Sequence, residues 1–219
     1  MDKLLPSFEE TLFDMSLMET SIDLAEIGID SILDNPIVES IPFVKTVVGI
    51  AKTAQNIVER NLVKQTINFL NGYNSGEISE EKINAYRLKI TTDHDKAEEE
   101  LGRIIVILNK TVESEKSIIL GRLFRGYIMG YINWADFCDL TYAIDSLFIS
   151  DIPILLKTKG SGLEDPESDI SYRIDRLAAL GLVKTGTGTA DDSVGELRFF
   201  TYATITAFGE LFVKYGLEK

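Results

Sequence analysis

RLAALGLVK (residues 176–184) and TITAFGELF (residues 204–212) are the two stretches that decide the fold at the C-terminal end of this chain. The first has the pattern of the last turns of an amphipathic helix that closes at Gly181, because glycine adopts the left-handed backbone at a helix end without steric cost. The second contains Thr206, whose hydroxyl can cap a new helix. Between them the hydrophobic period changes from helical to strand-like. We therefore expect a helix, a strand pair and a closing helix.

The flanking sequence extends this order of elements. Helical patterns cover residues 151–158 and 169–180, and strand composition covers residues 182–185 and 197–202, on either side of a tip rich in glycine and threonine. Helix, turn, helix and hairpin in this order are typical of a winged helix. The spacing also predicts a small core, made of Leu177, Leu180, Leu182, Phe208 and Phe212.

Both quoted stretches together resemble the "rLeaLGLv … lT.lG..f" signature of many bacterial winged-helix proteins. The resemblance covers roughly the last 70 residues. It implies that Gly181 ends the recognition helix and that Thr206 and Gly209 start the final helix. This signature is shared by proteins of many functions, so it predicts a fold more than a task.

Upstream, apolar residues recur at helical spacing almost without interruption. The predicted helices cover residues 7–33, 43–70, about 79–108, 117–130 and 134–148, with prolines 36 and 42 bounding a short connector. The expected fold class is therefore mainly α: an acidic helical bundle over residues 1–149, followed by a C-terminal winged-helix (α+β) module over residues 150–219.

The third of these helices carries a stripe long enough to need a partner helix. Its members alternate spacings of three and four: Ile83, Arg87, Ile90, His94, Ala97, Leu101, Ile104 and Leu108. We expect the helix over residues 43–70 to pack against it in antiparallel fashion. The acidic first helix is then left to cover another face or to exchange with a second subunit, which favours a homodimer built on the helical body.

The layout of the whole chain is similar to that of the abortive-infection alpha family of bacteria and their mobile elements. The shared features are a proline-broken N-terminal region, a helical middle and a closing winged-helix-like segment. No diagnostic functional residue of that family matches here. The resemblance implies a setting of phage defence, prophage or counter-defence, and no mechanism.

Net charge argues against a nucleic-acid partner. The chain carries 22 basic and 35 acidic residues, for a formal net charge of −13, and residues 1–40 hold ten acids and one base. Residues 151–219 hold eight bases and eleven acids, whereas a DNA-reading module has a basic face. Because winged helices also serve as protein-interaction modules, we rank a protein partner above DNA.

Five residues are the candidate contacts to such a DNA or protein partner. Tyr172, Arg173 and Arg176 lie on the predicted recognition helix, and Lys184 and Arg198 lie on the two strands that follow it. On a DNA-binding winged helix these positions contact bases and phosphates.

The sequence contains no pattern that indicates catalysis, a cofactor or a metal. His94 is the only histidine, and its place in the apolar stripe indicates a packed or interface side chain. Cys138, the only cysteine, lies among apolar residues that favour an unreactive thiol. The run Gly186-Thr187-Gly188-Thr189 lacks a third glycine and a following helix, so it does not match a phosphate loop. We expect a non-enzymatic protein.

A cytoplasmic location is the simplest expectation, because the N-terminus lacks a basic region before an apolar run and one cysteine cannot form an internal disulfide. The most apolar stretch, residues 41–58, includes two lysines, so we expect no transmembrane segment.

Three functions remain open. The leading hypothesis is a protein-interaction or regulatory protein. The second is a transcriptional regulator whose dimer gathers Arg173, Arg176, Lys184 and Arg198 into one basic surface. The third is peripheral membrane binding through residues 41–64, which carry four bases and one acid beside an apolar face.

Overall fold

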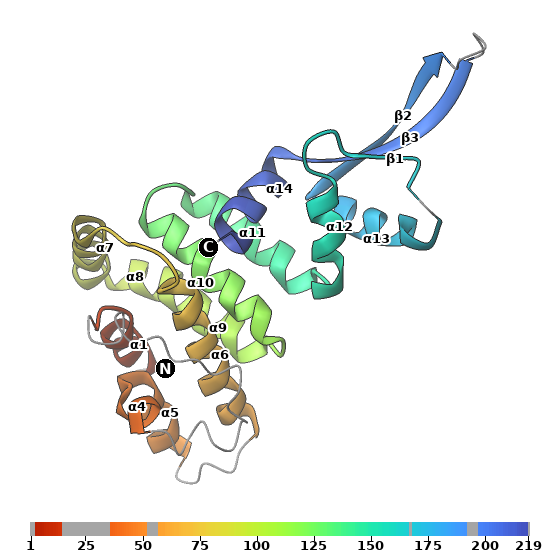
Figure 1. The fold of residues 1–219 in the computed structure, drawn as a ribbon. Coiled ribbons are helices and arrows are strands. Elements are labelled where there is room, and N and C mark those ends of the chain that lie inside the picture. The colour runs from red at the N-terminus through yellow and green to blue at the C-terminus, as the bar shows by residue number, and fades with distance from the viewer. Residues whose placement is uncertain (1–2, 15–35, 52–56, 167, 192–196, 219) are drawn as a thin grey trace. The chain divides into compact units, whose positions relative to one another are not determined.

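The computed structural model describes residues 3–14, 36–51, 57–166, 168–191 and 197–218. The chain divides into two compact units, Met1–Asn133 and Trp134–Lys219. The described parts are mainly helical, with one three-stranded antiparallel sheet near the C-terminus (Figure 1). The predicted domain boundary after residue 149 stays a prediction, because compactness alone does not establish an independent domain.

The described parts of the first unit are helical. The elements are α1 (Leu4–Leu12), α4 (Pro36–Ser40), α5 (Pro42–Ala51), α6 (Ile57–Tyr73), α7 (Glu80–Thr92), α8 (His94–Ala97), the π-helical turn η1 (Glu98–Gly102), α9 (Arg103–Lys110) and α10 (Ser114–Ile128). The connector expected between the two prolines is itself helical, since Pro36 and Pro42 each open a helix. Proline suits this position because its missing amide hydrogen has no helical partner there.

Two glycines set the closest helix crossing of this unit. A Cβ atom at Gly121 of α10 would overlap the carbonyl oxygen of Phe69 on α6, and one at Gly72 of α6 would overlap the carbonyl oxygen of Ile118 on α10. The backbones of α6 and α10 therefore approach more closely than any residue larger than glycine would allow at these two positions. Around the crossing, the Phe69 and Phe124 rings lie 5.8 Å apart and are fully buried. The helix over residues 43–70 was expected to pack on the third helix. Its C-terminal part, α6, does contact α9 (Arg103–Lys110), the last part of that predicted helix, but its most extensive contact is with α10.

The long third helix of the prediction is broken at Asp93. The backbone there is extended, with φ −132° and ψ 98°, and the Asp93 carboxylate accepts a hydrogen bond of 3.0 Å from the amide of Lys96. Asp93 thus ends α7 and caps α8, which a stripe of apolar spacing cannot reveal. The aliphatic members of the stripe are all buried: Ile83, Ile90, Ala97, Leu101, Ile104 and Leu108.

At the N-terminal end, α1 and α5 are joined by a buried hydrogen bond. The amide of Phe43 donates to the Thr11 hydroxyl at 2.9 Å, and the Phe8 and Phe43 rings meet edge to face at 5.1 Å. The predicted helix over residues 7–33 begins earlier, at Leu4, and α1 ends at Leu12; residues 15–35 of that prediction lie outside the described chain.

The second unit places helices before and after a hairpin (Figure 1). Its elements are α11 (Trp134–Ser146), the 3-10 turn η2 (Ile149–Asp151), α12 (Ile152–Lys157), β1 (Leu163–Glu164), α13 (Ser168–Ala179), β2 (Val183–Asp191), β3 (Leu197–Ile205), α14 (Ala207–Phe212) and the π-helical turn η3 (Val213–Leu217). The strand order is β1-β3-β2, and both pairings are antiparallel.

The quoted sequence stretches act here as predicted. Gly181 has a φ of +74° just after α13, and the Thr206 hydroxyl accepts a hydrogen bond of 2.9 Å from the amide of Gly209 at the start of α14. Of the predicted core, Leu177, Leu182 and Phe212 are fully buried, whereas Leu180 and Phe208 are half-exposed.

Candidate functional site

The structure gathers three of the five predicted contact residues on one helix. Tyr172, Arg173 and Arg176 lie on α13, and the Tyr172 side chain is 56% exposed. Lys184 is exposed on β2. Arg198 lies on β3 opposite Ala190, and its side chain is outside the described part of the chain.

Both arginines of α13 are bound to one buried carboxylate. Asp151, 1% exposed, accepts from Arg173 Nε at 2.7 Å and from Arg176 Nη2 at 2.8 Å through the same oxygen, Oδ1. A nitrogen of Arg173 also donates to the backbone carbonyl of Ser150. These contacts tie α13 to the turn η2. On a DNA-binding helix these arginine N–H groups would face phosphates. Here the N–H groups bonded to Asp151 and Ser150 face the protein itself.

Arg176 also lies beside two exposed aromatic rings. Its guanidinium carbon lies 4.1 Å from the ring centre of Phe148 and 5.1 Å from that of Tyr172. Phe148 is 53% exposed. An aromatic and arginine surface held in place by a second interaction is typical of the residues that dominate protein-protein interfaces. Below, these three residues are called the stacked surface: Phe148, Tyr172 and Arg176.

A groove of about 340 Å³ runs between α13 and the hairpin. Among the described residues, its polar lining consists of Asp175 and of hydroxyls from serine, threonine and tyrosine, and none of these lining residues is basic. Ser171, Thr185, Thr187, Thr201 and Tyr202 supply the hydroxyls. A groove that offers a carboxylate and no cation is poorly suited to a phosphate backbone.

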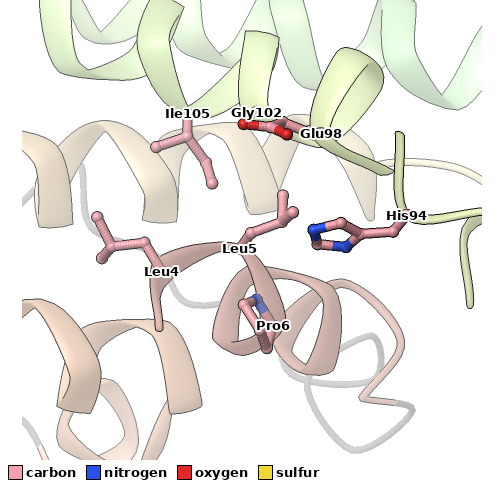
Figure 2. A pocket seen from close by; sticks show the side chains of 7 residues that line it. All are labelled: Leu4, Leu5, Pro6, His94, Glu98, Gly102 and Ile105. Atoms are coloured by element: carbon pink, nitrogen blue, oxygen red, sulfur yellow. The ribbon is translucent and has the colours of Figure 1, made fainter. Parts of the chain in front are cut away.

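In the first unit, a cavity of about 240 Å³ lies between α1 and the segment that follows α7. Figure 2 shows Leu4, Leu5 and Pro6 on one side and Ile105 on the other, with the His94 ring beside Leu5. His94 was expected to be a packed or interface side chain. It is not packed, because the break at Asp93 takes it out of the buried stripe and leaves it exposed. Of the lining residues that the structure describes, only His94 and Glu98 are ionisable, and none is a serine, threonine or cysteine that could act as a nucleophile.

A buried polar cluster in the first unit was not predicted from the sequence. Glu100 is fully buried, and its Oε1 accepts from Lys89 at 2.6 Å and from the Tyr127 hydroxyl at 2.9 Å. Lys89 also donates to the Tyr127 hydroxyl at 2.6 Å. These bonds connect α7, η1 and α10. In the sequence, Glu98-Glu99-Glu100 resembles a run of charges exposed to solvent. The only sequence feature that could have indicated burial of Glu100 is its position next to Leu101 of the apolar stripe.

The same cluster leaves two polar atoms without a hydrogen bond among the described residues, Glu100 Oε2 and the Tyr86 hydroxyl. Burial, and next the negative charge of Glu100, raise the pKa of Tyr86 far above its ordinary value. The cluster opens into neither of the two hollows described above. Its geometry is that of a cross-link between helices, although π-helical turns also recur at functional sites.

Within the described ranges, no group of three or more histidine, cysteine, aspartate or glutamate side chains could hold a metal ion. Cys138 is half-buried in α11. No helix in those ranges is long and apolar enough to cross a membrane. Most of the described apolar residues in the segment considered for peripheral membrane binding are buried within the first unit, namely Ile41, Phe43, Val44, Val47, Leu62 and Val63, whereas Ile57 and Val58 are exposed.

Comparisons with protein-family models, with curated proteins and with solved structures found no match.

Proposed function

We propose that this chain is a non-enzymatic interaction or regulatory protein whose second unit binds another protein through the stacked surface of Phe148, Tyr172 and Arg176. The bacterial phage-defence, prophage or counter-defence setting is part of the proposal, and the family resemblance in the sequence is its sole support. A cytoplasmic location is proposed with it.

The observation that carries the proposal is the pairing of both α13 arginines with Asp151. The negative charge of Asp151 offsets part of the positive charge that a ligand phosphate would need, while the guanidinium of Arg176 lies against exposed aromatic rings. The exposed rings beside Arg176 supply the large contact area and low side-chain entropy that binding surfaces use.

The second unit is proposed to be a modified winged helix. Three features support this: α13 closes at a glycine, an antiparallel hairpin follows it, and Thr206 caps the next helix. One feature departs from the pattern. A helix-turn-helix joins its two helices by a short turn, whereas here β1 lies between α12 and α13 and pairs with β3. The departure lengthens the connection between α12 and α13, although the two helices still contact each other.

A matched set of single variants in a pull-down tests the proposal. The full-length chain is used as bait in bacterial extracts made with and without phage infection. Tyr172→Ala and Phe148→Ala should each remove a specifically captured protein. Leu88→Ala, on α7 in the first unit, is the matched control, because Leu88 is 64% exposed and lies outside the stacked surface. Capture that survives both aromatic changes would contradict the proposal.

A further inference from the structure

The outer edge of β2 is a row of unpaired backbone groups. The sheet order β1-β3-β2 leaves β2 as a terminal strand, and among the described residues no strand pairs with its other side. A long exposed edge is a template for another strand unless charge, proline or a bulge blunts it. β2 is nine residues long, contains no proline and pairs one to one with β3 from Val183↔Ile205 to Asp191↔Leu197, without a bulge.

Hydrogen bonds on the far side of β3 determine which residues of β2 face outward. The amide of Ile205 donates to Thr158, and the amide and carbonyl of Thr201 bond to Asp165, so Ile205 and Thr201 point away from β2. Their partners, Val183 and Thr187, therefore do not share hydrogen bonds with β3. By alternation, the outward backbone groups belong to Val183, Thr185, Thr187, Thr189 and Asp191.

This row is symmetric about Thr187. We infer that β2 is the dimerisation edge of the protein, and that it pairs in antiparallel fashion with β2 of a second copy across a two-fold axis at Thr187. The two Thr187 residues then face each other, and Thr185 of each copy faces Thr189 of its partner. The three exposed outward residues, Thr185, Thr187 and Thr189, each gain a partner, whereas Val183 is buried within its own unit; the two sheets join into one of six strands. A two-fold axis requires such a self-complementary patch.

End charges favour the antiparallel copy over a parallel one. The base in β2, Lys184, stands near its start, and Asp191 stands at its end. In the register about Thr187 these two residues are not directly opposite each other, since Lys184 stands opposite Ala190 of the partner. Antiparallel pairing nevertheless places unlike ends of the two strands side by side, whereas parallel pairing places like ends side by side.

Side-chain packing within the hairpin also keeps β2 extended. Gly186 and Gly188 would leave β2 weak, but the rings of Tyr202 and Phe200 on β3 lie across them, so that a Cβ at either glycine would collide with the ring. Such ring cover rescues glycine in a strand. This interface differs from the helical-body dimer expected from the sequence, and it does not depend on the proposed function.

Light scattering on the full chain tests the inference first. From about 1 to about 100 µM protein, the mass should rise from that of the 24.4 kDa chain to twice that value. Thr187→Pro removes the outward amide, which the monomer does not use, and should raise the dimer dissociation constant at least about tenfold because the central hydrogen bonds are lost. Thr187→Ala keeps the amide and should dimerise like the parent chain.

Spin labels test the register. In a Cys138→Ser background, cysteines are introduced singly at positions 185, 187 and 189. The intermolecular dipolar broadening should be strongest at 187, and it should be weaker and equal at 185 and 189, where the offset along the strands is about 14 Å. A monomer throughout the concentration range, a dimer indifferent to Thr187→Pro, or broadening that is not greatest at 187 would each overturn the inference.

Discussion

Asp151 holds two guanidinium groups in the second unit through one carboxylate oxygen. Asp151→Ala leaves Arg173 and Arg176 partly buried beside a vacated site, and losing one partner of a buried ion pair costs about 3 to 5 kcal/mol. We expect the free energy of unfolding of this unit to fall by that amount. Urea titration followed by the fluorescence of Trp134, the single tryptophan, measures it.

Glu218→Ala is the matched control for that change. It removes the partner of Lys159, and both side chains of this pair are substantially exposed, so screening by solvent leaves no measurable loss. Equal effects of the two substitutions would show that Asp151 is not the anchor described above.

The raised pKa of Tyr86 predicts how the stability of the first unit changes at alkaline pH. Its pKa is raised in the folded chain from an ordinary value of 10.0, so the folded state keeps the phenol neutral while the unfolded chain ionises. The stability that this shift contributes is fully present below pH 10 and is lost as the pH rises further. Tyr73, raised by burial, acts in the same direction.

Tyr86→Phe should therefore reduce the loss of stability between about pH 8 and about pH 11. Urea unfolding followed by circular dichroism at both pH values measures the difference. Tyr142→Phe serves as the control, since Tyr142 is 68% exposed. The interpretation fails if Tyr86→Phe and the parent chain lose the same stability over this range.

At the scale of elements, the crossing of α6 and α10 makes a prediction with a built-in contrast. Gly121→Ala would place a methyl group against the backbone of α6, so one helix must shift, at a cost of about 1 to 3 kcal/mol. Gly49→Ala, in α5, meets no atom within 4 Å and should stabilise the chain by about 0.5 to 1 kcal/mol through helix propensity. Thermal unfolding of both variants should give shifts of opposite sign.

The sequence could predict elements where local chemistry decides them. Gly181 and Thr206 mark helix ends by their own backbone and hydroxyl, so the starts of β2, β3 and α14 were predicted within one residue. The ends of the strands were not: β2 continues to Asp191 and β3 to Ile205, beyond the predicted 182–185 and 197–202, because strand pairing runs through the glycine and threonine residues expected to form the tip. The break at Asp93 was missed because the apolar stripe continues through it, and the side chain that caps α8 shows only in the fold. The inward turn of Glu100 was missed for a related reason: a π-helical turn changes the helical period.

The contact residues show the same limit. Tyr172, Arg173 and Arg176 could be assigned to one helix from spacing, and the structure places them together on α13. Their common partner, Asp151, lies in an earlier turn, and nothing in the sequence connects it to them. Phe148, which completes the stacked surface, was treated in the sequence only as the end of a helix.

For the whole molecule, the central claim is that the α13 arginines serve the fold and not a nucleic acid. The most direct test is fluorescence anisotropy of a labelled random DNA duplex, titrated with the full chain at about 50 mM and about 200 mM salt. We predict at most weak binding at the lower salt, none at the higher, and no change with Arg173→Ala or Arg176→Ala in variants shown to be folded. Tight, sequence-selective binding that both substitutions abolish would contradict the claim.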